Sequence, residues 1–207
     1  SGVSVLTTSD QIEASKVLEG LPPLRSGLSK AKDDWLAWRE ALTQYPVRTD
    51  DSVSNLVWEI IGEMHKEKHS RGGDFVDTPA ERLNDDRIRG VCNHSSRGHM
   101  AEDLHRYLFA ACYAQINDCS PTLQEFPREL LPRHKNVNKA INGGYFEDRF
   151  RVQVSSRPST TITSHIAKDG HYYIHPDPSQ CRSLTVREAA RFQTFPDNYF
   201  FEGPRTE

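Results

Sequence analysis

Residues 181–201 read CRSLTVREAARFQTFPDNYFF and contain clear signals for the start and the end of a helix. Ser183 or Thr185 can cap the helix, and Glu188 follows Thr185 at the spacing of a capping box. Small and apolar residues then recur at helical spacing as far as Pro196, where the helix stops because proline lacks the backbone N–H donor. The stretch therefore predicts a short helix that closes the fold.

Three short runs of β-branched and aromatic residues precede the closing helix. A Lys-Asp-Gly turn at residues 168–170 separates the last two runs, which predicts that they form an antiparallel hairpin. Leu184 and Phe195 are expected to pack the closing helix onto this small sheet. The three runs are residues 150–154, 160–166 and 171–175.

Apolar residues in the N-terminal part of the chain repeat with the period of amphipathic helices. The whole pattern predicts an α+β fold with an N-terminal helical layer, a small antiparallel sheet or hairpin and a closing C-terminal helix. We expect a mainly helical part over residues 1–132, and the hairpin segment with the closing helix over residues 133–207. The N-terminal helices are expected at residues 9–20, 33–45, 51–68 and 100–117.

The composition of the 207 residues, with 36% hydrophobic and 27% charged residues, indicates a polar, soluble chain. No apolar run approaches the roughly 18 residues that a membrane span needs, and the N-terminus lacks the pattern of a signal peptide. We therefore expect a cytoplasmic protein with no membrane partner. The four cysteines (Cys92, Cys112, Cys119 and Cys181) follow no metal-binding spacing, so free thiols are expected.

Basic residues are concentrated in one segment of a chain whose formal net charge is -3. Residues 133–182 contain eight Lys or Arg and four Asp or Glu, whereas residues 1–132 contain fifteen and twenty-one. Such an asymmetry indicates local contact with a polyanion. Chance clustering of solvated charges is the alternative interpretation.

The chain carries no recognisable motif for catalysis. No cysteine follows a proline, and the Gly-Gly pairs at residues 72–73 and 143–144 lack the strand-then-helix context of a nucleotide-binding loop. The histidines near Cys92 and Cys181 match no common zinc spacing, so we interpret them as polar residues of loops. The sequence thus predicts no catalytic, cofactor-binding or metal-binding residue on this chain.

The basic hairpin segment is the candidate binding site. Thr161, Thr163 and His165 would share one face of a strand, and hydroxyl groups flanked by Arg and Lys suit phosphate oxygens. The alternative is a half-exposed strand whose threonines reflect β propensity alone. The candidate DNA-binding residues are Arg157, Thr161, Thr163, Ser164, His165 and Lys168.

Thirteen residues of the stretch 181–201 also fit the pattern R-x-L-T-x-R-E-x-A-R-x-Q-x-F-P-D-x-Y-x-F. This pattern resembles the ninth motif of DNA (cytosine-5) methyltransferases, and RPSTTITS at residues 157–164 is similar to the Pro-x-x-Thr-Ile-Thr element of that family. The matching residues are Arg182, Leu184, Thr185, Arg187, Glu188, Ala190, Arg191, Gln193, Phe195, Pro196, Asp197, Tyr199 and Phe201.

The resemblance implies a structural role for the polar residues of the ninth motif. Arg187 and Glu188 are expected to form a charge-assisted pair that ties the closing helix to neighbouring backbone. A plain exposed ion pair, worth under about 1 kcal/mol, is the alternative. The residues expected to organise the fold rather than to contact bases are Arg182, Thr185, Arg187, Glu188, Arg191 and Gln193.

The resemblance further implies an enzyme family that transfers a methyl group from S-adenosylmethionine to C5 of cytosine in duplex DNA, as in restriction-modification. The family's Phe-x-Gly-x-Gly cofactor loop, Pro-Cys loop and Glu-Asn-Val motif have no counterpart here. We therefore expect a target-recognition region with the ninth motif, which binds double-stranded DNA and is inactive without a separate catalytic domain. S-adenosylmethionine is expected for the full-length enzyme, and no cofactor on this chain.

A different class of function is also compatible with the sequence. The acidic helical half could dock a separately encoded catalytic subunit, which would make the chain a protein-interaction module. Trp35 and Trp38 would then serve as interface anchors, although core packing is the commoner use of such a pair. DNA binding that weakens steeply with salt would favour the first function over the second.

Overall fold

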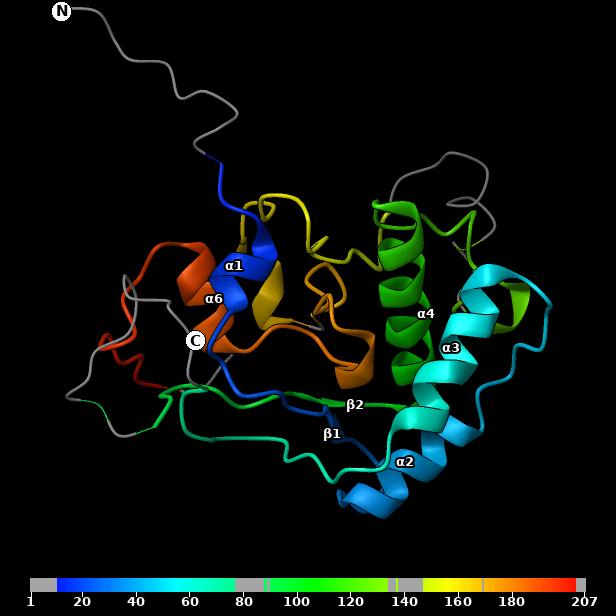
Figure 1. Cartoon of the computed structure of the whole chain (residues 1–207), viewed down its shortest axis with the longest axis horizontal. Coiled ribbons are helices and arrows are strands. Elements are labelled where there is room, and N and C mark those ends of the chain that lie inside the picture. The colour runs from blue at the N-terminus through cyan, green and yellow to red at the C-terminus, as the bar shows by residue number, and fades with distance from the viewer. Residues whose placement is uncertain are drawn as a thin grey trace, which may run out of the picture.

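The computed structural model describes residues 11–76, 88, 90–133, 137, 147–168 and 170–203. The α-helices are α1 (Ala14–Leu18), α2 (Trp35–Thr43), α3 (Ser52–Glu63), α4 (Ala101–Asn117) and α6 (Val186–Phe192); the 3-10 helices are η2 (Arg128–Leu130), η3 (Ser164–Ala167) and η4 (Pro178–Gln180); the strands are β1 (Gly27–Leu28) and β2 (Gly98–His99). In Figure 1, α2, α3 and α4 gather at one end and α1 and α6 at the other, with β1 and β2 between them.

The hydrophobic core gathers around α4, against which α2 and α3 pack. Trp38 and Leu42 of α2 and Val57 and Ile61 of α3 are buried, which confirms the apolar stripes predicted for these helices. Each large apolar side chain buried in this way contributes roughly 1.5–3 kcal/mol. From α4 the core receives Leu104, Tyr107, Leu108, Phe109, Ala110, Cys112 and Ala114.

Aspartate caps fix where α2 and α3 begin. Asp34 and Asp51 each accept a hydrogen bond at 2.8 Å from the backbone amide three residues later, which stabilises a helix start by about 1 kcal/mol. α3 ends at Glu63 rather than at the predicted residue 68. The chain leaves the helix there, and Lys68 instead donates to the Ser179 carbonyl at 2.9 Å.

The only sheet within the described residues is the pair β1–β2, which runs in parallel with Gly27 opposite Gly98 and Leu28 opposite His99. The predicted α+β class is confirmed, whereas the predicted antiparallel sheet is wrong. A Cβ atom on Gly27 would stand 3.2 Å from the Gly98 Cα atom. The two glycines therefore allow a close approach of the strands that residues with side chains would obstruct.

The segments expected to form the hairpin do not pair with each other. Val152 and Ile174 form an isolated parallel bridge, and Ile174 and Ser183 form an antiparallel one. The expected strand at residues 160–166 is absent: its first part is irregular, and η3 takes up the rest. Asp169 of the expected turn lies outside the described residues.

Side chains replace strand partners in this region. The Thr160 amide donates to Gln153 Oε1 at 3.0 Å, and the Thr163 amide donates to the Tyr173 hydroxyl at 2.8 Å. A backbone whose amides are satisfied in this way has no need of a neighbouring strand. The β propensity of the threonine run is therefore overridden by its tertiary surroundings.

The closing helix packs differently from the prediction. Leu184 is 2% exposed, as expected for a core residue, but Phe195 is 37% exposed and does not pack the helix onto a sheet. α6 contacts α1 instead. Trp38 is fully buried and donates from its indole nitrogen to Ser26 Oγ at 2.8 Å, so it belongs to the core and is not an interface anchor.

Within the described ranges, no helix has the length and apolar character that crossing a membrane requires.

Candidate nucleic-acid interface

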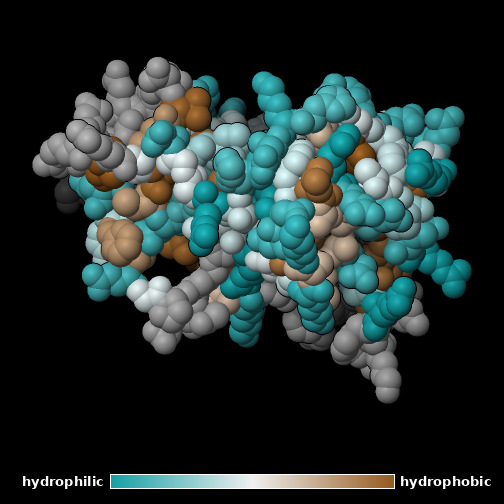
Figure 2. Space-filling model, turned by 90° about the horizontal axis from the view of Figure 1, so that it is seen from below, coloured by the Kyte–Doolittle hydropathy of each residue, from teal (hydrophilic) through white to brown (hydrophobic). Residues whose placement is uncertain are grey.

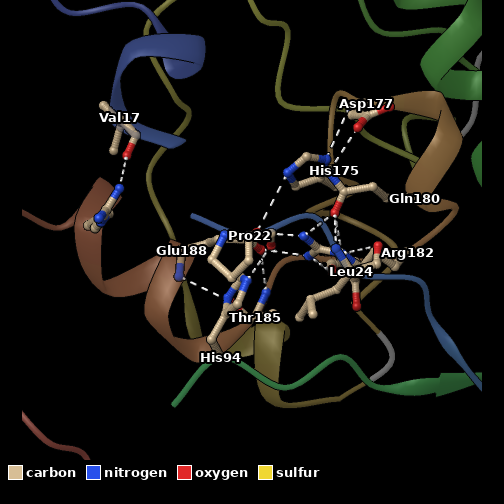
Figure 3. A network of polar contacts seen from close by, with 12 residues as sticks. Val17, Pro22, Leu24, His94, His175, Asp177, Gln180, Arg182, Thr185 and Glu188 are labelled. Atoms are coloured by element: carbon tan, nitrogen blue, oxygen red, sulfur yellow. Dashed lines mark hydrogen bonds and ion pairs between the residues drawn. The ribbon is translucent and has the colours of Figure 1, made fainter. Parts of the chain in front are cut away.

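The closing helix is fixed to the rest of the chain by a buried ion pair. Arg182 and Glu188 are each 1% exposed and form two parallel hydrogen bonds, Nη1 to Oε2 at 2.7 Å and Nη2 to Oε1 at 2.6 Å. Arg182 also donates to Gln180 Oε1 at 2.6 Å and to the Leu24 carbonyl at 3.3 Å (Figure 3). The pair therefore connects α6 to a segment near the N-terminus of the described chain.

The start of α6 confirms the predicted capping box. Thr185 Oγ1 accepts from the Glu188 amide at 3.2 Å, and the Glu188 carboxylate accepts from the Thr185 amide at 2.7 Å. The His94 ring lies between Thr185 Oγ1 at 3.0 Å and the Pro22 carbonyl at 2.9 Å (Figure 3). Because a carbonyl only accepts, Nε2 of His94 carries the proton, and Nδ1 accepts from the threonine hydroxyl.

Arg187 is fully buried and bonds only to backbone oxygens at hydrogen-bond distance. Its guanidinium donates to the carbonyls of Cys92 at 3.0 Å, Pro196 at 3.0 Å and Tyr199 at 2.5 Å. The expected pair between Arg187 and Glu188 is wrong, because the Glu188 carboxylate is occupied by another arginine. Arg187 ties the helix to the backbone directly, without its sequence neighbour.

Arg191 fixes the segment that follows α6. It forms two hydrogen bonds to the Asp197 carboxylate at 2.9 and 2.6 Å, and it donates to the carbonyls of Val17 at 3.1 Å and Glu19 at 2.7 Å. Gln193 is exposed and ends the helix as its C-cap residue. The arginines of the motif thus face inward, and their fixed geometry holds the neighbouring segments together.

The buried cluster around Glu188 controls the ionisation of His175. Burial, together with the nearby Arg182, lowers the pKa of His175 from 6.5 to about 4. His175 Nδ1 accepts from the Asp177 amide at 3.1 Å, and Nε2 lies 3.6 Å from Glu188 Oε1 (Figure 3). Burial opposes the charge on Glu188, but the Arg182 guanidinium outweighs it and holds the pKa of Glu188 well below its usual range.

The candidate DNA-binding residues lie together on one exposed segment, residues 157–168, which we call the recognition loop. All six candidates are exposed. Thr161, Thr163 and His165 do not share one face of a strand, because Ser164 begins η3. The structure therefore brings the predicted residues into one loop, but it presents them from an irregular backbone.

Two buried side chains hold the recognition loop to the core. Gln153 is 1% exposed and bonds both the amide of Thr160 at 3.0 Å and its hydroxyl, through Nε2, at 3.1 Å. Tyr173 is 4% exposed, and its hydroxyl bonds the Thr163 hydroxyl at 2.8 Å. These anchors fix the loop so that the residues between them project outward.

Arg97 and Asp118 contact the two ends of the recognition loop. Arg97 donates to the Ala167 carbonyl at 2.7 Å and also to the Lys168 carbonyl. At the other end, Arg157 Nη2 lies 3.1 Å from Asp118 Oδ2 in an exposed ion pair. Arg157 also borders a hollow of about 240 Å³ whose lining includes Ser120, Thr122, Arg151 and Thr160.

Sequence reasoning missed the residues that position the loop. Gln153 alternates with Val152 and Val154 in the predicted strand at residues 150–154, and this position is the one signal that the sequence gives for it. The sequence gives no such signal for Tyr173, Arg97 and Asp118, since their roles depend on contacts between distant parts of the chain. Buried amide and hydroxyl groups of this kind usually have a partner, but the sequence does not name it.

The two buried thiols are not activated, and the described residues hold no metal cluster. Burial raises the pKa of Cys112 to about 12 and that of Cys181 well above its usual value, so these thiols are not poised as nucleophiles. In the described ranges, no group of three or more His, Cys, Asp or Glu side chains could hold a metal ion. All four cysteines are free, as expected.

The sequence of the chain is similar to those of known DNA methyltransferases. The sequence model described as "C-5 cytosine-specific DNA methylase" matches residues 31–207. The type II methyltransferase M.Bpa9945I of Bacillus paralicheniformis is 40% identical over 171 residues, which cover 83% of this chain and 36% of that protein. M.AgeI of Thalassovita gelatinovora is 33% identical over 94 residues, covering 45% and 21%, and M.Eco47II of Escherichia coli is 51% identical over 47 residues, covering 23% and 11%.

This chain spans little more than a third of the length of M.Bpa9945I, and no solved structure matches it significantly. The family match nevertheless covers most of the chain and includes both the recognition loop and the buried arginines of α6. The chain therefore belongs to the C-5 cytosine-specific DNA methylase family.

Proposed function

We propose that this chain is the DNA target-recognition region of a cytosine-5 methyltransferase and that it binds double-stranded DNA through the recognition loop. The observation that carries this proposal is a row of exposed hydroxyl and basic side chains on a loop whose backbone is anchored by buried Gln153 and Tyr173. Phosphate contacts of this kind orient a protein on the duplex. The family match supports DNA as the ligand.

The loop supplies the two kinds of group that phosphate oxygens need. Among the described residues, no partner holds the hydroxyl groups of Thr161 and Ser164, so they are available as donors. Lys168 is exposed and provides positive charge at the end of the loop. Arg157 shares its charge with Asp118 at an exposed site, where exchanging a carboxylate for a phosphate costs little.

The remaining parts of the reaction belong, in this proposal, to a catalytic domain that is not on this chain. That domain would supply the Pro-Cys nucleophile and bind S-adenosylmethionine, and the complete protein would act in the cytoplasm as part of a restriction-modification system. Residues 1–132 and 133–207 would then be the mainly helical and the loop-bearing parts of the recognition region. The length of M.Bpa9945I outside the matched segment supports such a division.

We expect the isolated chain to transfer no methyl group from S-adenosylmethionine to DNA. The buried thiols Cys112 and Cys181 have raised pKa values, and the sequence lacks the family's cofactor loop. Transfer of tritium from labelled S-adenosylmethionine to duplex DNA measures this directly. Turnover above that of a heat-denatured sample would show that the catalytic role assigned to another domain is wrong.

Replacing Lys168 with alanine is expected to weaken binding to all duplex sequences alike. Loss of one phosphate contact should reduce the magnitude of the slope of log K against log salt by about 0.9, because fewer counterions are released. The slope is measured by titrating fluorescent duplexes of mixed sequence at several salt concentrations.

Lys66 provides a matched control for Lys168. It is also exposed and lies just beyond the end of α3. Lys66→Ala should change neither the slope nor the affinity. If the two variants weaken binding equally, or if binding is insensitive to salt, the recognition loop is not the DNA-binding face, and the protein-interaction module becomes the better account.

A further inference from the structure

The segment that follows α6 exposes a cluster of aromatic rings. Phe195, Tyr199 and Phe200 are 37%, 49% and 59% exposed. The ring centroids of Phe195 and Tyr199 lie 5.1 Å apart, and those of Tyr199 and Phe201 lie 4.8 Å apart. Figure 2 shows exposed brown and tan atoms among teal ones at the left end of the molecule, the end at which Figure 1 places α6, and others in the right half. We call Phe195, Tyr199, Phe200 and Phe201 the aromatic patch.

Buried charged groups hold the backbone of the aromatic patch in place. Arg187 donates to the carbonyls of Pro196 and Tyr199, and Arg191 holds Asp197 by two hydrogen bonds. Such charge-assisted bonds are among the strongest that a side chain can make with backbone or carboxylate. Two buried arginines of α6 therefore fix a segment whose exposed side chains include Phe195, Tyr199 and Phe200.

The far end of the patch is fixed as well. Asn93 adopts a left-handed backbone conformation with φ 57°, and its side-chain amide bonds both the amide of Phe201 at 3.0 Å and its carbonyl at 2.9 Å. A backbone that is held in this way loses less conformational entropy when its surface binds a partner. Aromatic side chains presented on rigid backbone are the usual anchors of protein–protein interfaces.

The charge of the segment disfavours DNA as the occupant. Between residues 193 and 203 the sequence contains no Lys or Arg, and its two acidic residues are Asp197 and Glu202. Asp197 is buried in its pair with Arg191. Surfaces that bind duplex or single-stranded DNA combine their contacts with positive charge, which residues 193–203 do not supply. A patch of exposed aromatic rings without basic groups fits a protein surface instead.

We infer that the aromatic patch is the surface on which the catalytic part of the methyltransferase docks, an inference that rests on the proposed function. M.Bpa9945I, the relative with 40% identity, matches this chain over 36% of its length, so most of that enzyme lies outside the matched segment. The patch begins at Phe195, which lies within the matched region and four residues after Arg191, the last buried arginine of α6. Its occupant is therefore a folded protein domain that buries the rings of Phe195, Tyr199 and Phe200.

The test uses the full 207-residue chain and, as the probe, M.Bpa9945I from which the matched segment has been deleted. The folded state of the probe is first verified by circular dichroism and by binding of S-adenosylmethionine. Calorimetric titration should give a one-to-one complex whose affinity changes little between low and high salt. Phe200→Ser and Tyr199→Ala should each weaken it by about tenfold or more, as truncation of an aromatic anchor does.

Leu36 is the matched control. It is 74% exposed on α2, which Figure 1 places at the opposite end of the molecule, so Leu36→Ser should leave the affinity unchanged. Equal weakening by Leu36→Ser, or no binding to a folded probe, would overturn the inference. If light scattering shows that the wild-type chain is a dimer and that Phe200→Ser is a monomer, the patch binds a second copy of the chain instead.

The same variants separate this inference from the proposed function. Phe200→Ser should leave the salt-dependent DNA affinity of the chain intact, whereas Lys168→Ala should weaken DNA binding and leave docking intact. If the wild-type chain docks but does not bind DNA, the proposed function fails and the docking surface stands. If Phe200→Ser abolishes DNA binding, the patch belongs to the DNA face and the docking inference is wrong.

Discussion

Replacing Glu188 with alanine should lower the free energy of unfolding by about 3–5 kcal/mol, which is the usual cost of removing one partner of a buried ion pair. The substitution leaves the Arg182 guanidinium, which is 1% exposed, without its carboxylate in a place that water does not reach. It also removes one half of the capping box with Thr185. Urea unfolding at neutral pH, followed by circular dichroism, measures the loss.

Two further variants show whether the loss arises from the buried charge. Asp118→Ala removes one partner of an ion pair that is 57% and 59% exposed, and it should cost less than about 1 kcal/mol. The double substitution Arg182→Met with Glu188→Leu removes both charges, so it should recover a large part of the stability lost in Glu188→Ala. A double variant as unstable as the single one would show that shape and packing, rather than an unpaired charge, determine the cost.

The elements that were predictable from sequence are those specified by nearby residues. Thr185 and Glu188 specify the start of α6 within four positions, and the apolar period specifies α2, α3 and α4. In each case the signal and its structural consequence lie within a few turns of the same helix. The family resemblance was recognisable for the same reason, because its matching residues stand at fixed spacing in one stretch.

The features that were not predictable depend on contacts between distant residues. Arg182, Arg187 and Arg191 were recognised as structural residues, but the sequence could not show that Arg182 takes the Glu188 carboxylate while Arg187 takes carbonyls. The parallel pairing of Gly27 with Gly98 joins segments whose own sequences give no strand signal. Local propensity does not specify such partners.

The candidate site was predictable only in part, for the same reason. Composition identified the basic, hydroxyl-rich residues 157–168, but the hairpin geometry assigned to them was wrong because Gln153 and Tyr173 capture the loop amides. Of the aromatic patch, Phe195 was predicted to be a core residue, since it looks like any apolar residue after a helix. Exposure, rather than residue type, reveals its function.

Lowering the pH from about 7.5 to about 5 should destabilise the chain, and His175 alone should account for about 2 kcal/mol of that loss. Its pKa is about 4 in the folded chain, against an ordinary value of 6.5. Between these two values the unfolded chain binds a proton that the folded chain does not, so stability rises with pH across this window. Burial also lowers the pKa of His94 and His105. These two histidines therefore also make the free energy of unfolding rise with pH.

Urea unfolding at a series of pH values isolates the contribution of His175 by comparing two histidine substitutions. His175→Gln removes the buried titrating group, so the pH dependence should become shallower by about 1.2 kcal/mol per pH unit near pH 5.5, whatever the stability of the variant at neutral pH. His165→Gln removes a histidine that is exposed on the recognition loop, and it is the control for the loss of a histidine side chain. If the slopes of both variants equal that of the wild type, His175 is already charged beside Glu188, 3.6 Å away, and the cluster under α6 is an ion triad rather than a neutral histidine packed against an ion pair.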